Sequence, residues 1–302
     1  MTRLSVFASL FLVSACAFLP PGSPDPVGND PRVFDSAHPP ELVETRFESH
    51  GDRMNAIIYV AQGAGPHPTV ILLHGFPGNE RNLDLAQAIR RGGWNVVFFH
   101  YRGAWGSDGV FSFGHVIEDV ASVVAAVRSE EFAAAHRIDA SQIALVGHSM
   151  GGFAALVSAA DLSEVACVAS LAGANLGAFA MAAADPEQQA AIAASLDGWA
   201  GPIRGMSGAE LVAELRETPD RFDTIARAPL LARKPVLLLA GARDEVTPTA
   251  VHHDPLVAAL SAANAPRFDS RVLERSDHSF SSDRIAVARI LVDWLRTGCD
   301  VP

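Results

Sequence analysis

The sequence has few cysteines, few basic residues and no common metal or cofactor motif, which excludes several classes of protein. Its 302 residues include only three cysteines, too few for the disulfide framework of a small secreted domain. The 23 basic residues are scattered and outnumbered by 34 acidic ones, so we expect no nucleic-acid partner and no polybasic contact with lipid. There is no H-E-x-x-H motif, Cys and His cluster or Gly-rich loop followed by Lys, so we expect no metal and no cofactor.

Long apolar runs are also missing beyond the N-terminus. Residues 4–13 form an apolar run after Arg3, but this run is about half the ~20 residues that a spanning helix needs. A short positive segment, an apolar run and small residues are typical of a signal peptide, which we place at residues 1–16. The sequence therefore predicts export.

The end of this signal allows two interpretations. The letters V-S-A-C, which end at Cys16, resemble the bacterial lipobox and predict lipidation of Cys16. The same stretch also permits ordinary cleavage after Ala17. Residues 17–40 are rich in Pro, Gly, Asp and Ser, as expected of a tether. We expect a lipid-anchored protein of a bacterial cell envelope, or otherwise a periplasmic or secreted one, with no membrane contact except through the lipid.

Strand and helix patterns alternate through the rest of the chain. This alternation predicts an α/β fold with a mostly parallel sheet of about eight strands, flanked by helices on both faces. The expected strands are residues 42–48, 54–61, 69–74, 94–100, 143–147, 165–171, 235–241 and 267–273. The expected helices of the main body are residues 82–91, 115–128, 149–160 and 283–295.

The alternation stops between about residues 174 and 232. Ala-rich helical stretches at 186–196 and 208–217 indicate an inserted helical cap. Ligands of such sheets bind at the carboxyl ends of the strands, so we expect the cap to shape the substrate pocket.

The strongest chemical motif surrounds Ser149. Residues 143–152 read I-A-L-V-G-H-S-M-G-G, an apolar strand that passes through G-x-S-x-G into a helix. In this context the motif is a nucleophile elbow, in which glycines permit a turn so tight that it exposes the Ser149 hydroxyl.

A serine hydroxyl needs a base, and the base needs a group that holds it in the correct tautomer. Asp244 follows one expected strand and His278 follows the last, in the order serine, acid, histidine that accompanies such an elbow. Glu245 is an alternative acid, although Asp244 lies closer to the strand end. Asp277 is adjacent to His278 in sequence and poorly placed to reach its ring. We predict that Ser149, Asp244 and His278 are catalytic.

The negative oxygen formed during attack on a carbonyl needs preorganised donors. The sequence H-G-F-P-G at residues 74–78 ends the third strand, where one backbone donor is expected, and the residue after the nucleophile supplies the other. We predict the N–H groups of Phe76 and Met150, with Gly75 as an alternative to Phe76 because Pro77 has no N–H.

With these motifs, residues 41–297 resemble the α/β-hydrolase superfamily, which implies an α/β-hydrolase fold. The segment Y-R-G-A-W-G-S-D-G at residues 101–109, followed by Phe111, resembles a loop of bacterial esterases of the cinnamoyl-esterase kind and of relatives of acylaminoacyl and dipeptidyl peptidases. The β-propeller of prolyl-oligopeptidase-like enzymes does not precede this domain, which favours the esterases.

We therefore expect a serine hydrolase that cleaves carboxylic esters through an acyl-serine intermediate, acting on a small-molecule ester or a short peptide. The alternatives are a serine peptidase, an acyltransferase and a non-catalytic surface-binding lipoprotein. Cys167 lies in an apolar run and is expected to be a buried thiol, while pairing with Cys299 stays open. The sequence does not determine the oligomeric state.

Overall fold

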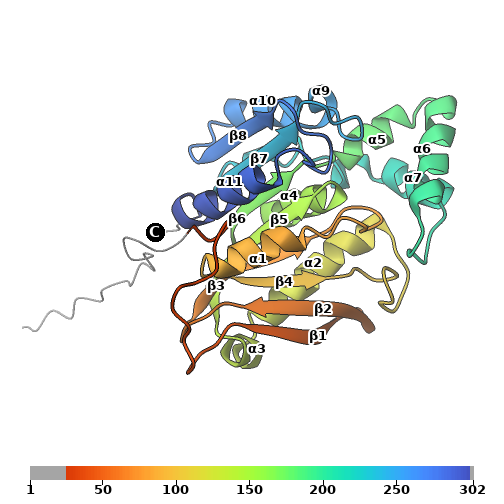
Figure 1. Ribbon diagram of the computed structural model, residues 1–302. Coiled ribbons are helices and arrows are strands. Elements are labelled where there is room, and N and C mark those ends of the chain that lie inside the picture. The colour runs from red at the N-terminus through yellow and green to blue at the C-terminus, as the bar shows by residue number, and fades with distance from the viewer. Residues whose placement is uncertain (1–24, 300–302) are drawn as a thin grey trace, which may run out of the picture.

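In the computed structural model, which describes residues 25–299, an eight-stranded sheet runs through the molecule (Figure 1). The strand order is β1-β2-β4-β3-β5-β6-β7-β8; the β1/β2 and β2/β4 pairs are antiparallel and all others parallel. The mostly parallel sheet of about eight strands is thus confirmed. The strands are β1 (Glu41–Ser49), β2 (Asp52–Val60), β3 (His67–Leu73), β4 (Asn95–Phe99), β5 (Ile138–His148), β6 (Val165–Leu171), β7 (Val236–Gly241) and β8 (Phe268–Leu273).

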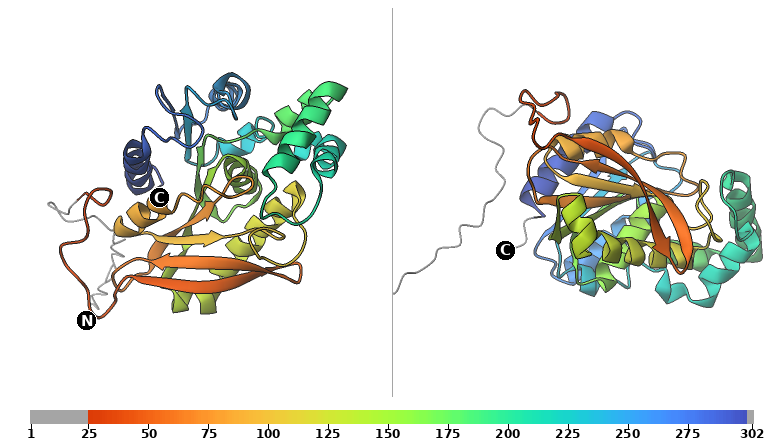
Figure 2. Two further views of the ribbon diagram at one scale, coloured as in Figure 1. Left: turned by 45° about the vertical axis from the view of Figure 1, so that its right-hand side comes forward. Right: turned by 90° about the horizontal axis from the view of Figure 1, so that it is seen from below.

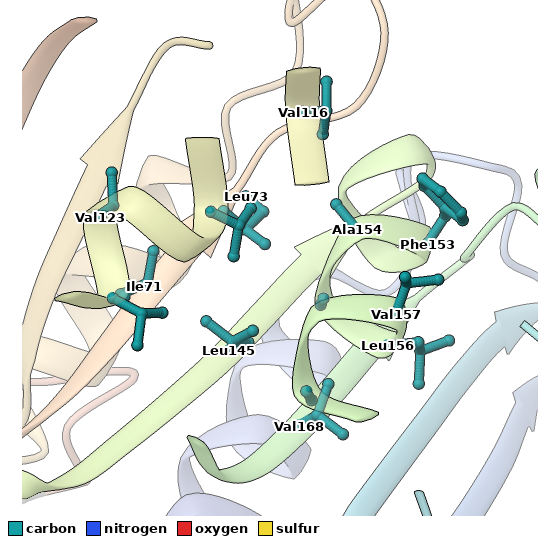
Figure 3. Packing of buried hydrophobic residues seen from close by; sticks show 14 of the residues in the cluster. Ile71, Leu73, Val116, Val123, Leu145, Phe153, Ala154, Leu156, Val157 and Val168 are labelled. Atoms are coloured by element: carbon teal, nitrogen blue, oxygen red, sulfur yellow. The ribbon is translucent and has the colours of Figure 1, made fainter. Parts of the chain in front are cut away.

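Helices cover both faces of this sheet, as the apolar strands require. Successive strand residues face opposite sides, so Ile71 and Leu73 belong to one buried cluster while Val70 and Leu72 belong to the other. One face is covered by α1 (Leu83–Arg91) and α11 (Arg284–Thr297). The opposite face, part of which Figure 3 shows, is covered by α2 (Phe113–Val127), α3 (Glu130–Ala135), α4 (Met150–Asp161), α8 (Ala228–Leu231) and α10 (Asp254–Ala262).

The predicted cap is an excursion of the chain between β6 and β7. Figure 2 shows its helices standing out at one end of the molecule. Asp185 and Ser207 begin two of them by accepting hydrogen bonds from the first free backbone N–H groups. The cap comprises α5 (Leu176–Ala182), α6 (Pro186–Trp199), α7 (Gly208–Glu217) and a 3₁₀ turn (Pro219–Arg221). The chain returns to the body at α8, and the short helix α9 (Thr249–His252) follows β7.

The cap is attached to the loop that follows β4. The Gly103 carbonyl accepts from the Arg204 N–H at 2.7 Å, and the Phe111 N–H donates to the Arg204 carbonyl at 2.9 Å. Gly103 has a φ of 71°, and a side chain there would collide with the Arg204 carbonyl. Glu214 of α7 accepts from the first two N–H groups of α2, where a carboxylate also complements the helix dipole.

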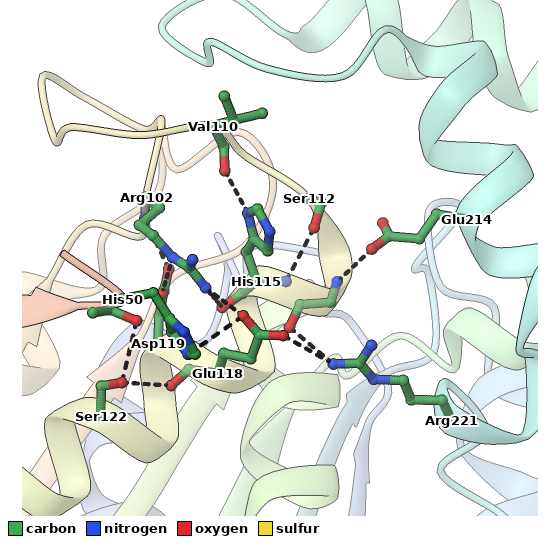
Figure 4. A network of polar contacts seen from close by, with 12 residues as sticks. His50, Arg102, Val110, Ser112, His115, Glu118, Asp119, Ser122, Glu214 and Arg221 are labelled. Atoms are coloured by element: carbon green, nitrogen blue, oxygen red, sulfur yellow. Dashed lines mark hydrogen bonds and ion pairs between the residues drawn. The ribbon is translucent and has the colours of Figure 1, made fainter. Parts of the chain in front are cut away.

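The same loop is held to the body by a buried ion-pair network around Arg102 (Figure 4). Arg102 Nε lies 2.6 Å from Asp119 Oδ1, and its Nη2 lies 2.6 Å from Glu118 Oε2. The Asp119 side chain is fully buried, and burial raises the pKa of its carboxyl despite the hydrogen bonds from Arg102. Glu118 also pairs with Arg221 at 3.5 Å, so the network extends into the cap.

The two body cysteines form a disulfide, which corrects the expectation that Cys167 carries a free thiol. Cys167 in β6 and Cys299 after α11 are both buried, and their Cα atoms lie 5.5 Å apart, within the range for bridged cysteines. The sequence could not show this pairing because 132 residues separate the two positions. The bridge fastens the end of the chain to the middle of the sheet.

The segment before β1 has no helix or strand between residues 25 and 40, but it packs on the body. Arg91 Nε donates to the Pro26 carbonyl at 2.6 Å, and Asp25 pairs with Arg289 at 3.0 Å. The predicted signal peptide, Cys16 and the first part of the predicted tether lie outside the described residues.

We predict that Arg102→Met lowers the free energy of unfolding by about 3–5 kcal/mol, because it leaves the Asp119 carboxylate buried without its partner. Urea unfolding followed by circular dichroism measures this loss. Arg53→Met is the matched control, since it removes an exposed ion pair with Asp108 and should cost much less. Equal losses in the two variants would contradict the structural role of the Arg102 network.

Candidate active site

Ser149 occupies the sharp turn between β5 and α4. Its φ of 59° and ψ of −122° lie outside the ordinary regions for a non-glycine residue. The turn brings Ser149 against the loop after β3, where a Cβ at position 75 would lie only 2.9 Å from the Ser149 Cβ. Gly151 packs in the same way on the carbonyl of Leu73. Glycine at these positions lets two strand ends approach closely enough to present the hydroxyl.

Asp244 and His278 meet at the carboxyl ends of β7 and β8. His278 Nδ1 lies 2.8 Å from Asp244 Oδ2, and the Asp244 side chain is 1% exposed. The N–H groups of Val246 and Thr247 each donate to Oδ1 at 2.8 Å, and the Thr247 hydroxyl donates to Oδ2 at 2.6 Å. Burial raises the pKa of Asp244, but the hydrogen bonds from His278 and Thr247 outweigh burial and lower it to about 2. Asp244 is therefore a carboxylate that fixes the Nδ1–H tautomer of His278.

The alternative acids are placed differently. Asp277 accepts from the backbone N–H groups of Ser279 and Ser281, at 3.1 and 2.9 Å, so it stabilises its own loop. Glu245 is exposed and lines the pocket. The structure thus brings Asp244, rather than either neighbour, to the imidazole of His278.

Two further residues hold the His278 loop in place. His148 Nε2 lies 2.8 Å from the His278 carbonyl, and the two imidazole rings are 4.8 Å apart. Burial lowers the pKa of His148 to about 4, so at neutral pH its Nε2–H donates to that carbonyl. Arg284 donates to the Ser279 carbonyl at 3.1 Å and binds Asp84 at 2.6 Å. The loop is therefore clamped from both β5 and α1.

The predicted oxyanion donors lie beside this pair. Phe76 and Met150 line the same pocket as Ser149 and His278. The buried His74 donates from Nδ1 to the Gly75 carbonyl at 2.7 Å. Because a trans peptide points its C=O and N–H in opposite directions, this bond orients the Phe76 N–H away from His74.

His74 and Trp105 brace this loop. Burial lowers the pKa of His74 to about 4, so its ring is neutral and its Nε2 accepts from His100 Nδ1 at 3.2 Å. Trp105 Nε1 donates to the Pro77 carbonyl at 2.8 Å. Bonds of this kind keep the loop in one arrangement before any substrate arrives, as an oxyanion site requires.

A pocket of about 840 Å³ opens over Ser149. Its floor comes from the ends of β3 and β5, and its walls come largely from the cap. Most of the wall is apolar, and the charged side chains among the lining residues are the two carboxylates Glu80 and Glu245. The apolar lining consists mainly of Phe76, Phe113, Leu176, Phe179, Ile192, Leu196, Trp199 and Leu215.

Within residues 25–299, no group of three or more His, Cys, Asp or Glu side chains is arranged to hold a metal ion. No helix in that part of the chain is both long and apolar enough to cross a bilayer.

Sequence reasoning missed the residues that support the predicted ones. Thr247 bonds to Asp244 three residues away, but its contact with His278, that of His74 with His100 and that of Arg284 with Asp84 are made only by the fold. His148 lies inside the G-x-S-x-G motif, but its spacing carries no sign that the ring would meet the His278 carbonyl. No pattern in a single sequence marks these contacts.

The chain is similar to proteins of a known family. The sequence profile described as "Alpha/beta hydrolase family" matches residues 70–290. The chain belongs to the alpha/beta hydrolase family. The match includes Ser149, Asp244, His278 and the cap of this alpha/beta hydrolase. Among curated protein sequences, none is a match.

Solved structures share the fold at low sequence identity. A 2,6-dihydroxy-pseudo-oxynicotine hydrolase is 21% identical with a TM-score of 0.66, covering 87% of this chain and 69% of that one. The esterase Est1E from Butyrivibrio proteoclasticus, solved with ferulic acid, is 20% identical with a TM-score of 0.67, covering 84% and 98%. A puromycin-hydrolyzing peptidase from Mycobacterium tuberculosis is 20% identical with a TM-score of 0.65, covering 89% and 40%. Esterases and peptidases thus both occur among the structural neighbours of this alpha/beta hydrolase.

We predict that this alpha/beta hydrolase loses stability as the pH falls from 7 to 5. Burial lowers the pKa of His74 and of His148 to about 4, whereas an unfolded histidine binds its proton near pH 6.5. Between these values the unfolded chain binds more protons, so each residue costs about 2 kcal/mol at pH 5. Urea unfolding at both pH values measures the effect. His148→Gln keeps a side-chain N–H donor and should reduce the loss; an unchanged pH dependence would refute this assignment.

Proposed function

We propose that the protein is a serine hydrolase that cleaves carboxylic esters through an acyl-Ser149 intermediate. The observation that carries the proposal is the positive-φ turn at Ser149 in one apolar pocket with His278, whose ring is oriented by the buried Asp244 carboxylate. Nucleophile, base and orienting acid are the parts that acyl transfer to serine requires.

In the first half of the proposed reaction, His278 Nε2 takes the proton of Ser149 as Oγ bonds to the ester carbonyl carbon. The negative charge that develops on the carbonyl oxygen is stabilised by the N–H groups of Phe76 and Met150, each contributing about 10²- to 10³-fold in rate. The carbon–oxygen bond to the alcohol then breaks, and His278 gives its proton to the leaving alkoxide. Asp244 remains ionised throughout.

In the second half, water replaces the alcohol. His278 removes a proton from the water as its oxygen attacks the acyl carbon, and the same two N–H groups stabilise the oxyanion. Collapse breaks the bond to Ser149 Oγ, which takes the proton back from His278. The products are a carboxylic acid and the free enzyme.

The pocket supports an ester with an apolar acyl group. Its cap wall, formed by side chains such as Leu176, Phe179 and Leu196, has no basic residue that would bind a carboxylate of the substrate. Burial of apolar surface supplies about 25 cal/mol for each Å² removed from water, so a longer acyl chain should bind more tightly until it fills the pocket.

A serine peptidase is the second candidate, and one observation favours it. Glu80 and Glu245 line the pocket, and neither forms an ion pair within residues 25–299. Two unpaired carboxylates would suit the free ammonium group of a short peptide. The esterase is preferred because most of the pocket wall is apolar.

We further propose that the protein is exported and lipidated at Cys16. The signal-like N-terminus supports this proposal, and so does the Cys167–Cys299 disulfide, because such bridges persist mainly in oxidising compartments.

We predict that the purified protein without residues 1–17 hydrolyses nitrophenyl esters, and that Ser149→Ala abolishes this turnover while leaving the circular dichroism spectrum unchanged. Asp244→Asn should lower kcat by roughly 10⁴-fold, since it no longer fixes the imidazole tautomer. Esters of increasing chain length should show kcat/KM rising and then reaching a plateau.

Aminoacyl nitroanilides form the other half of the panel. If the protein hydrolysed these anilides faster than the esters, the serine peptidase would be the better proposal. Hydrolysis by Ser149→Ala at the wild-type rate would disprove the mechanism, and hydrolysis of neither substrate class would favour an acyltransferase or a binding protein.

For export, mass spectrometry of the mature N-terminus should find a chain that begins at Cys16 and carries lipid. The expected mass shift should vanish in Cys16→Ala. An unmodified chain that begins at Phe18 would contradict lipidation while preserving export.

A further inference from the structure

A polar groove continues from the catalytic pocket on the side of His278. It has a volume of about 510 Å³ and lies between the start of α1 and the loop that precedes α11. Asn79, Glu80 and Ser279 line both the groove and the pocket, so the two spaces meet. The rest of its lining is mainly polar and includes Arg81, Asn82, Ser281 and Arg284.

The chemistry of the proposed reaction determines which part of the substrate points this way. The leaving alcohol must receive its proton from His278, so it lies on the His278 side of the ester carbonyl. Ser279 follows His278 directly and lines the groove. The acyl group then lies on the opposite side of the ester carbonyl. That side of the pocket is apolar, and Phe179 and Leu196 of the cap form its wall.

We propose that this groove is the binding site for the alcohol portion of the ester, and that it selects a neutral, hydroxyl-rich alcohol such as glycerol or a sugar. The inference rests on the proposed esterase function and adds the substrate class. It predicts a substrate with two unlike ends, an apolar acyl group under the cap and a polar alcohol in the groove.

Two hydrogen-bonding groups at the groove have unused capacity. Arg81 lines the groove, and its guanidinium stacks on Trp105 at 4.2 Å from the ring centroid and forms no ion pair within residues 25–299. The Asn82 side chain is buried, and its Oδ1 accepts from Arg284 Nη1 at 3.0 Å. Its Nδ2 has no hydrogen-bond partner in the described part of the chain, so this donor has unused capacity.

The charges of the groove favour a neutral ligand. Arg81 and Arg284 supply two positive charges, and Glu80 and Asp84 supply two negative ones. Arg284 and Asp84 already form an ion pair at 2.6 Å. The balanced charges offer donors and acceptors together without net attraction for a cationic or an anionic alcohol.

The test compares esters of one acid with different alcohols: ethyl butyrate, glyceryl monobutyrate, butyrylcholine and the butyrate ester of glycolate. We expect kcat/KM for the glycerol ester to exceed that for each of the others by about tenfold or more, mainly through a lower KM, because one or two hydrogen bonds to charged or rigid donors supply that factor.

Two variants assign this preference to the groove. Arg81→Met removes the donor while keeping an apolar chain against Trp105, and Ser281→Phe fills the groove from an exposed position. Each should lower the ratio of kcat/KM between the glycerol and ethyl esters by about tenfold. Ser282→Phe is the matched control, since its neighbouring exposed position does not line the groove, and its ratio should equal that of the wild type. Thermal unfolding confirms that each variant is folded.

Three results would overturn the inference. In the first, the wild type hydrolyses ethyl butyrate but shows no preference for the glycerol ester. In the second, the preference persists in both Arg81→Met and Ser281→Phe. In the third, the choline or glycolate ester is preferred, so that the groove selects charge. Hydrolysis of none of the esters would instead overturn the proposed function itself and the inference with it.

Discussion

The close approach of β3 and β5 at their carboxyl ends is the constraint on which the site depends. Gly75 and Gly151 have no side chains there, so the strand ends and the start of α4 come together without steric conflict. This contact permits the positive-φ turn at Ser149, which lines the same pocket as Phe76 and Met150. The proposed nucleophile and the proposed oxyanion donors are therefore parts of a single packing arrangement. Any side chain at position 75 would disturb both together.

The other half of the site depends on a buried charge, the Asp244 carboxylate, and on the hydrogen bonds that compensate for its burial. The buried Asp244 remains ionised because its carboxylate oxygens accept three hydrogen bonds from its own loop and one from His278. His148 and Arg284 then hold the main chain of the His278 loop. The imidazole is therefore oriented before substrate binds, as the proposed mechanism requires.

The two sides of the proposed substrate site have different origins in the fold. The cap is an insertion, and it closes the apolar side through contacts of Arg204 and Glu214 with the body. The polar groove lies in the body, at the point where α1 and α11 face each other across the Asp84–Arg284 ion pair. Changes in the cap would therefore alter acyl selection without moving the groove.

The sequence by itself determined the eight strands, the elbow at Ser149 and the position of the cap, because each depends on local periodicity or on a short motif. It also selected Asp244 and His278, since both follow strands whose carboxyl ends must meet at one edge of the sheet. Only the tertiary structure decided the Cys167–Cys299 bridge, the orientation of the Gly75–Phe76 peptide by His74, and the groove beside Ser279. The bridge and the groove join residues from elements far apart in the chain, and the His74 ring contacts His100, which follows β4, so a single sequence has no local signal for these arrangements.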